Sequence, residues 1–183
     1  MNAGLRKQII DSAGNVQYTY VAHWEIVNRL KKRYRIIKIA QIVLTAVAAT
    51  GFLVSITAGI SWLNWVGGLT SAVSLGLNLY MLNFNLPSEI KQHTDAANDL
   101  WDVREAYNSL LTDFDSLQEN EIRDKRDRIT QEVSRINKAY PGTDKKSFAE
   151  AQKDMPKYKF EDGEAEKILN IATTETEDNG KKD

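Results

Sequence analysis

The sequence predicts an all-α membrane protein, in which a two-helix transmembrane hairpin lies between a cytoplasmic amphipathic pre-helix and long C-terminal helices. From Ile39 to Ser88, about fifty residues pass without Asp, Glu, Lys, Arg or His, although 27% of the whole chain is charged. A bilayer core about 30 Å thick needs roughly twenty apolar residues per helical crossing, so this segment suits two crossings and a short turn. On both sides of it, apolar residues recur at helical spacing.

The composition argues against an enzyme. The chain has no Cys, so it can form neither a disulfide framework nor a thiolate zinc site. It contains no HExxH, Gly-rich phosphate loop or GxSxG motif. By helical pattern, His23 and His93 fall on polar surfaces, and Asp113 and Asp115 cap or solvate a helix end. We therefore predict no catalytic residue, no cofactor and no metal ligand.

The segregation of charge divides the chain into four regions. They are an amphipathic N-terminal helix (1–38), a transmembrane hairpin (39–88), a cytoplasmic helical or coiled-coil region (89–140) and a disordered tail (141–183). The first helix is expected to start at Val16, after a polar lead with a turn or helix-start signal at 12–15. Because neither Pro nor Gly separates it from the apolar run, it should continue directly into the membrane.

The first span is predicted at residues 36–58 and the second at 65–86, just before Pro87. Six basic residues crowd the N-terminal border, whereas the turn has none: Arg29, Lys31, Lys32, Arg33, Arg35 and Lys38. By the positive-inside rule this border is cytoplasmic, so two crossings place both termini in the cytoplasm. The same side chains suit anionic lipid head groups of the bilayer. A net charge of −1 and the lack of a basic groove with interleaved aromatics argue against nucleic acid.

A long helix is predicted after Ser88, which would be its N-cap. A heptad-like apolar stripe suited to a bundle or coiled coil follows: Ile122, Ile129, Val133, Ile136 and Tyr140. We expect the pre-helix to pack against region 89–140 through four residues: Trp24, Trp101, Tyr107 and Leu111. Large apolar residues are rare in the tail, which predicts disorder apart from one short helix near 164–171.

Two sets of residues in the spans suggest helix contacts. Small residues recur at every fourth position: Gly51, Ser55 and Gly59 in the first span, and Gly68, Ala72 and Gly76 in the second. Such faces let helices approach closely, within one hairpin or between the protomers of a homo-oligomer. A polar stripe runs along the second span: Ser71, Ser74, Asn78 and Asn85, with Gln41 and Thr45 available on the first. Buried amides either bond across helices or line a water-filled pore, which two crossings alone cannot enclose.

Two segments resemble one known family. They are the amphipathic helix His23-Trp-Glu-Ile-Val-Asn-Arg-Leu-Lys-Lys-Arg-Tyr34 and the later run Leu100 to Asp115. In the second, Trp101, Arg104, Glu105, Tyr107, Leu110 and Leu111 occupy a Trp–(Arg/Glu)–Tyr–Leu-Leu pattern. With the tight hairpin between them, residues 16–140 resemble the SLATT family, small bacterial two-transmembrane effectors associated with cyclic-oligonucleotide synthases and SLOG nucleotide sensors.

The resemblance implies an antiphage-defence effector of the bacterial inner membrane. Such an effector oligomerises to form a pore or perturb the membrane on an infection signal, and so arrests or kills the cell. A nucleotide second messenger or a partner defence protein would be its trigger. The alternative is a non-channel, membrane-anchored scaffold that recruits a partner through its cytoplasmic helices. A soluble bundle with a buried hairpin would need more amphipathic helix than this chain supplies.

Overall fold

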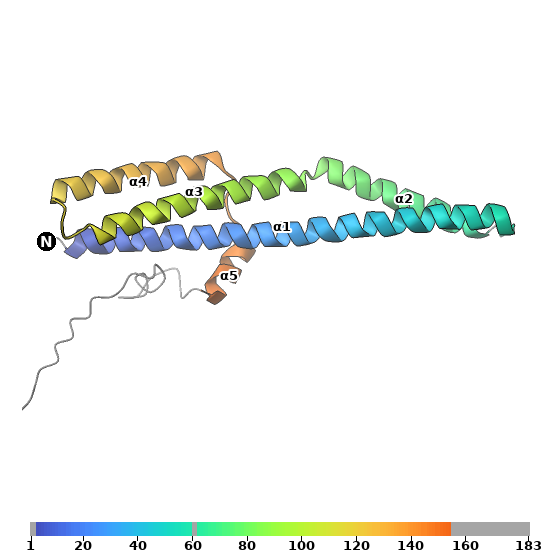
Figure 1. The fold of residues 1–183 in the computed structure, drawn as a ribbon, viewed down its shortest axis with the longest axis horizontal. Coiled ribbons are helices and arrows are strands. Elements are labelled where there is room, and N and C mark those ends of the chain that lie inside the picture. The colour runs from blue at the N-terminus through green and yellow to red at the C-terminus, as the bar shows by residue number, and fades with distance from the viewer. Residues whose placement is uncertain (1–2, 60–61, 155–183) are drawn as a thin grey trace, which may run out of the picture. The chain divides into compact units, whose positions relative to one another are not determined.

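A computed structural model of the chain describes residues 3–59 and 62–154, and every regular element in these ranges is a helix. The helices in order are α1 (Ala3–Ala58), α2 (Trp62–Asn83), α3 (Leu86–Thr112), α4 (Glu119–Ala139) and α5 (Lys145–Asp154), as Figure 1 shows. The predicted all-α class is confirmed. The helices form two compact units. One, the hairpin unit, is Val27–Lys91; the other, the helical bundle, consists of residues 3–26 and 92–154.

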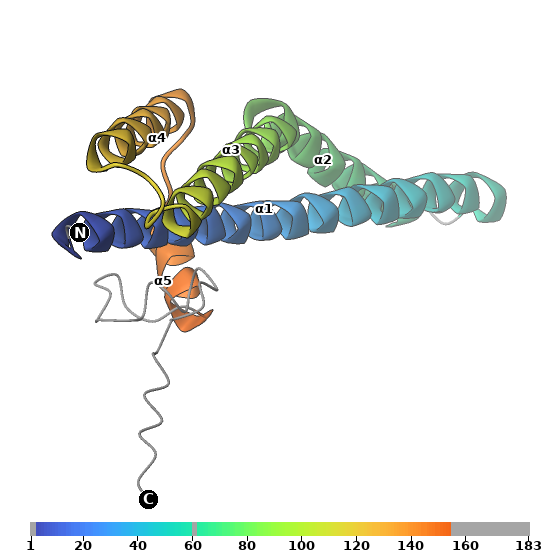
Figure 2. The ribbon, with the colours of Figure 1, turned by 60° about the vertical axis from the view of Figure 1, so that its left-hand side comes forward.

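The core of the helical bundle lies between α1, α3 and α4, which run side by side in Figures 1 and 2. From α1, the buried side chains of Leu5, Ile9, Ala13 and Val16 recur at steps of four, four and three residues. This is one face of a helix, and it packs against Leu100, Val103, Tyr107, Leu110, Leu111 and Phe114 of α3 and against Ile122 and Ile136 of α4.

The start of α1 corrects the sequence analysis. The polar lead, the turn at residues 12–15 and the helix start at Val16 are wrong, because α1 is helical from Ala3. Ser12 does not break the helix, since its hydroxyl donates to the carbonyl oxygen of Gln8, 2.8 Å away. The buried apolar face supplies the stabilisation that local propensity at Gly14 and Asn15 does not.

Part of the predicted disordered tail is helical. Asp144 caps α5: its carboxylate accepts a hydrogen bond from the Ser147 N–H at 2.7 Å, and its own N–H donates to the Ser147 hydroxyl at 3.3 Å. The Tyr18 hydroxyl donates to the Phe148 carbonyl at 2.5 Å, and the two rings meet edge to face. Ala151 is fully buried in the same cluster. Disorder is therefore the wrong prediction for 145–154, because α1 offers this helix a docking surface.

In Figures 1 and 2, α5 lies on the side of α1 away from α4. The short helix expected near 164–171 lies outside the described residues, as does the tail from 155 onward.

The hairpin unit contains the two apolar spans. α1 ends at Ala58, as predicted, and α2 begins at Trp62, three residues before the predicted start of the second span. Gly59 has φ +65°, a left-handed conformation that glycine adopts at no steric cost and that commonly terminates a helix. Both helices are long and apolar enough to cross a membrane.

The surface of the spans fits lipid rather than water. Large apolar side chains on both helices are exposed, for example Ile42 (69%), Leu69 (70%) and Trp65 (83%). In the most apolar window of each span, at most 6% of the residues are buried. A soluble protein rarely exposes so continuous an apolar surface, so the alternative of a soluble bundle with a buried hairpin is not supported.

α3 begins earlier than predicted. Its first residue is Leu86, and the N-cap is Asn85 rather than Ser88. The Asn85 side-chain oxygen accepts a hydrogen bond from the Ser88 N–H at 3.3 Å, which satisfies one free donor of the first turn. Pro87 is tolerated in this first turn because its missing N–H would have no helical partner there.

Candidate functional site in the membrane hairpin

Two hydrogen bonds join the spans within the hairpin unit. The Gln41 side-chain amide donates to the Asn78 side-chain oxygen at 2.8 Å, and the Ser55 hydroxyl donates to the Asn64 side-chain oxygen at 2.6 Å. A polar group moved from water into an apolar environment without a partner costs roughly 2–7 kcal/mol. These bonds therefore fix the register of α2 against α1, one near each end of the second span.

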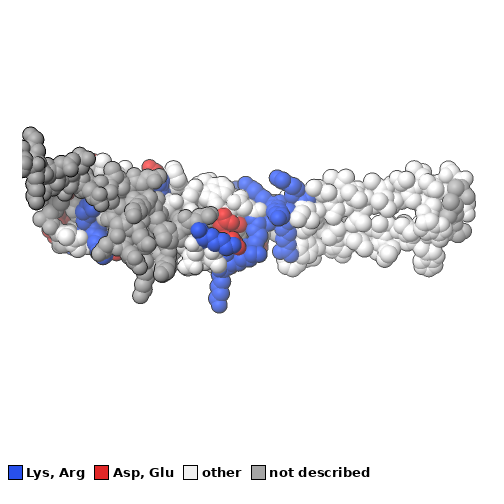
Figure 3. Space-filling model, turned by 90° about the horizontal axis from the view of Figure 1, so that it is seen from below, with Lys and Arg blue, Asp and Glu red and all other residues white. Residues whose placement is uncertain are grey.

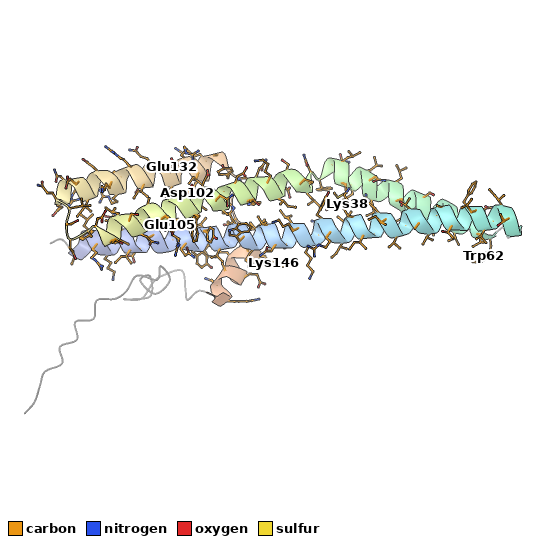
Figure 4. All side chains as sticks on the ribbon, in the orientation of Figure 1. Lys38, Trp62, Asp102, Glu105, Glu132 and Lys146 are labelled. Atoms are coloured by element: carbon orange, nitrogen blue, oxygen red, sulfur yellow. The ribbon has the colours of Figure 1, made fainter. Side chains whose placement is uncertain are left out.

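From the sequence, Asn78 was expected either to bond across the helices, with Gln41 and Thr45 available on the first span, or to line a pore. Asn64 was not among the candidates. The signal was present, since an amide stands between Trp62 and Trp65 near the tip of the hairpin, where Figure 4 labels Trp62. Its partner Ser55 was assigned instead to the small-residue face, and the structure shows it 7% exposed and hydrogen bonded.

The structure separates the four members of the polar stripe. Asn78 is bonded to α1, and Asn85 caps α3. Ser71 is exposed, and the Ser74 hydroxyl is buried without a hydrogen-bond partner in the part of the chain that the structure describes. Asn78 and Asn85 are therefore engaged within the chain, whereas the Ser74 hydroxyl has no hydrogen-bond partner among the described residues.

The small residues fall into an inner and an outer set. At Gly51 an added Cβ would lie 4.0 Å from the Leu63 carbonyl oxygen, and at Gly67 it would lie 3.9 Å from that of Ala48. These two glycines therefore face the opposite span. At Gly68 and Gly76 an added Cβ would meet nothing within 4 Å, and Ala72, between them on the same face, is exposed.

The sequence shows the spacing of the small residues but not which face of each helix they occupy. Gly67, which was not selected from the sequence, lies close to α1. At Gly68 and Gly76 an added Cβ would meet no neighbour, and Gly68 also lines an open groove between the spans. Gly59 also differs from its predicted packing role, because its positive φ makes it a turn residue with open space around it.

An open groove of about 800 Å³ runs between the spans. Its lining includes Thr45, Ala48 and Phe52 of α1 and Asn64, Gly67 and Ser71 of α2. The groove thus combines an apolar wall with hydroxyl and amide groups, at the depth where the interhelical glycines lie. No charged residue lines it.

The six basic residues of the border lie where the uncharged surface of the spans begins. On the face shown in Figure 3, the described residues of the spans are white, and Lys and Arg gather in a band at their edge. Arg29, Lys32 and Arg33 line a second open groove together with α2. Lys31, Arg35 and Lys38 are exposed outside it, and the Lys38 ammonium lies 5.6 Å from the centre of the Tyr34 ring.

The helical bundle holds a histidine pair that sequence reasoning missed. His23 and His93 are 4% and 7% exposed, so the prediction that both lie on polar surfaces is wrong. Their Nδ1 atoms are 2.8 Å apart. Burial, followed by the neighbouring His93, lowers the pKa of His23 from 6.5 to about 4. The available signal was spacing, because His23 follows buried Val16 by seven residues and precedes buried Val27 by four.

The predicted packing residues of the bundle occupy two environments. Tyr107 and Leu111 are buried in the core. Trp24 and Trp101 lie at its margin, where the Tyr20 ring contacts both, with centroid distances of 6.5 and 5.5 Å. The Arg104 guanidinium covers the Trp101 ring at 4.6 Å, which is a cation–π contact.

A groove of about 380 Å³ lies between α3 and α4, and Figure 4 labels Asp102 and Glu132 on its two sides. Arg135 donates to Glu132 at 2.6 Å and approaches Asp99 at 3.4 Å. The hydrogen bond from Arg135 lowers the pKa of Glu132. Within residues 3–59 and 62–154, no group of three or more His, Asp or Glu side chains is placed to hold a metal ion.

Comparison with known proteins gives one match. No curated protein and no solved structure matches the chain. Residues 5–164 match the family described as SMODS and SLOG-associating 2TM effector domain family 4, or SLATT. The match extends beyond residues 16–140, on which the resemblance was recognised, and takes in the first turns of α1 and the whole of α5. The chain therefore belongs to this family of two-transmembrane effector domains, and it is a membrane protein.

Proposed function

We propose that this chain is an antiphage-defence effector of the bacterial inner membrane, which oligomerises through its hairpins to form a pore or perturb the bilayer when infection is signalled. The observation that carries this proposal is the outer face of α2. Gly68, Ala72 and Gly76 form an exposed stripe of small residues, and an added Cβ at Gly68 or Gly76 would meet no atom of the described residues within 4 Å. Small faces let transmembrane helices approach closely where lipid gives no hydrophobic drive for association.

An aqueous path requires several copies. Backbone and polar side chains at membrane depth must be satisfied within protein or face a water-filled cavity. One hairpin leaves the groove with Thr45, Asn64 and Ser71 open on one side. In a ring of hairpins packed through the small residues of α2, Ser71 and Ser74 would line the path. Asn78 and Asn85 would support it, because their amides are held by Gln41 and by the start of α3.

Orientation follows from the basic border. We infer that Arg29 and the basic residues after it lie in the cytoplasm, since the positive-inside rule retains such borders there. Two crossings then return the chain to the same side. The helical bundle would face the cytoplasm, where an infection signal would reach it.

The trigger in this proposal is a nucleotide second messenger or a partner defence protein. The family description, which associates the domain with SMODS and SLOG, supports a nucleotide signal. The α3–α4 groove is the charged cavity of the bundle, but its arginines are faced by the carboxylates of Asp99, Asp102 and Glu132. A polyphosphate would compete with these carboxylates for Arg135. Calorimetric titration of the purified chain with cyclic oligonucleotides distinguishes direct sensing from a partner protein, since only direct sensing gives binding heat.

The alternative function, a scaffold that recruits a partner through the α4 stripe, has less support. Ile122 and Ile136 are buried in the core of the bundle, and Ile129, Val133 and Tyr140 pack against it. This chain therefore covers its own stripe. Replacing the hairpin with two unrelated spans separates the functions, because a scaffold would tolerate the exchange and a pore would lose activity.

A matched pair of substitutions tests the pore. Ala72→Leu adds bulk to the outer small-residue face of α2, and Ala46→Leu adds the same bulk to an exposed position of α1 outside the groove. Each variant is expressed in bacteria with a membrane-potential dye, and its oligomers are trapped by cross-linking. We expect Ala72→Leu to reduce both depolarisation and cross-linked oligomer, and Ala46→Leu to leave both near wild type. An intact membrane potential after strong expression of the wild-type chain, or equal effects of the two variants, would contradict the proposal.

A further inference from the structure

We propose that the hairpin unit contains a binding site for the head group of an anionic glycerophospholipid. The site is the open groove of about 450 Å³ between α1 and α2 at their charged end. Arg29, Lys32 and Arg33 form its rim, and Ile36 and Leu77 are among its apolar lining residues. It lies at the opposite end of the spans from the turn, and it is separate from the groove of the proposed pore.

The rim is built by helix geometry. Positions 32 and 33 follow position 29 by three and four residues, and position 36 follows them by four and three, so their side chains share one face of α1. The Arg33 guanidinium lies 5.3 Å from the centre of the Tyr80 ring on α2, which holds it over the groove. None of the lining residues is acidic. Three cations around one cavity therefore complement a phosphodiester, whose oxygens accept hydrogen bonds from guanidinium and ammonium groups.

The apolar lining residues form the floor of the groove, and they determine which class of phosphate compound fits it. Ile36, Ile37 and Leu77 carry no polar side-chain atom, and they begin the uncharged surface that the acyl chains of a bilayer would cover. A lipid would place its phosphate at the rim and its glycerol and first methylenes over the floor. A water-soluble phosphate would use the rim but leave the apolar floor exposed to water.

Other basic residues of the same border serve as a control for non-specific attraction between positive charge and anionic lipid. Lys31, Arg35 and Lys38 belong to the same basic border, and they lie outside the groove. On a helix with 3.6 residues per turn, positions 31, 35 and 38 point roughly opposite to positions 29, 32 and 33. Neutralising either set removes three positive charges from the same stretch, but only one set removes the rim.

The test is native mass spectrometry of the full-length chain, released from micelles that contain equal amounts of phosphatidylglycerol and phosphatidylethanolamine. The three rim cations surround one head group and form charge-assisted hydrogen bonds to it, so the wild-type chain should favour phosphatidylglycerol by about tenfold or more. We expect the combined Arg29→Gln, Lys32→Gln, Arg33→Gln variant to lose this preference. The Lys31→Gln, Arg35→Gln, Lys38→Gln variant should retain it within about twofold.

A second variant tests the groove without removing any charge, in case the triple variant misfolds. Leu77→Trp narrows the floor and leaves every charge in place, so it should also reduce retained phosphatidylglycerol. Equal losses in the two triple variants, or full retention in Leu77→Trp, would overturn the proposal. Displacement of phosphatidylglycerol by excess glycerol phosphate would overturn it too, because it would identify a site for soluble phosphates. These measurements need no pore, so their outcome is independent of the proposed function.

Discussion

The Nδ1 atoms of His23 and His93 lie 2.8 Å apart in the interior of the helical bundle, although 70 residues separate them in the chain. At this distance one nitrogen donates a hydrogen bond and the other accepts it, so the pair holds a single proton between them. A second proton in this contact would make both Nδ1 atoms donors and would place a positive charge on a buried imidazole. The hydrogen bond between α1 and α3 at this point therefore requires that one of the two Nδ1 atoms stay unprotonated.

This pair predicts that acid destabilises the bundle. The pKa of His23 falls from 6.5 to about 4 on folding, so between these pH values the unfolded chain binds more protons than the folded chain. Stability is fully present above pH 6.5 and is lost as the pH falls toward 4, by on the order of 2 kcal/mol from this group. Thermal unfolding of the full chain in detergent, followed by circular dichroism across this range, measures the loss.

The control for the acid effect is the double variant His23→Leu, His93→Leu. It keeps an apolar contact between α1 and α3, and it should flatten the pH dependence of the melting temperature in this range. If this variant and the wild type lose stability in parallel, the effect comes from carboxylates elsewhere.

The bond between Gln41 and Asn78 predicts coupled stability of the spans. Asn78→Leu leaves the Gln41 amide without its partner in an apolar region, so it should destabilise the hairpin. Interhelical hydrogen bonds in membranes are worth about 0.6 kcal/mol on average and up to about 1.7 kcal/mol. Unfolding in mixed micelles should show a coupling of this size in a double-mutant cycle with Gln41→Leu. Additive losses would mean that the two side chains act separately.

Features that depend on neighbouring residues alone could be predicted from the sequence. The absence of charge from Ile39 to Ser88 was sufficient to locate both spans, because a bilayer tolerates little else. Prediction failed where the partner is distant in the chain. Nothing near His23 indicates that His93 faces it, and the choice between Gly67 and Gly68 depends on the rotation of α2 toward α1. α5 was missed because ten residues rarely form a stable helix without a docking surface.

The turn of the hairpin predicts a position-specific cost for alanine. Gly59 has φ +65°, and an L-residue in the left-handed region costs roughly 1–2 kcal/mol. Gly59→Ala should lower the free energy of unfolding by about this amount even though the added Cβ meets no neighbour. Gly142→Ala is the matched control, since Gly142 also has open space but no positive φ. Equal effects in both variants would show that the backbone angle at Gly59 is not the cause.

The docking of α5 predicts local protection from hydrogen exchange. Phe148 contacts the Tyr18 ring at a centroid distance of 4.5 Å, so Phe148→Ala should release α5 and raise amide exchange in residues 145–154. Phe84→Ala removes a ring of the same size from an exposed position of the hairpin unit and should leave α5 exchange unchanged. Unaltered protection in Phe148→Ala would mean that Ala151 and the Asp144 cap hold the helix alone.

The two hydrogen bonds between the spans also impose an order on synthesis. Gln41 and Ser55 leave the ribosome before Asn64 and Asn78, so each amide of the second span emerges after the residue that pairs with it. An α2 that entered the bilayer alone would carry both amides into hydrocarbon uncompensated. The first span thus supplies the hydrogen-bond partners that the amides of the second span need in the membrane. We expect the first span to stay close to the insertion machinery until the second span has been synthesised.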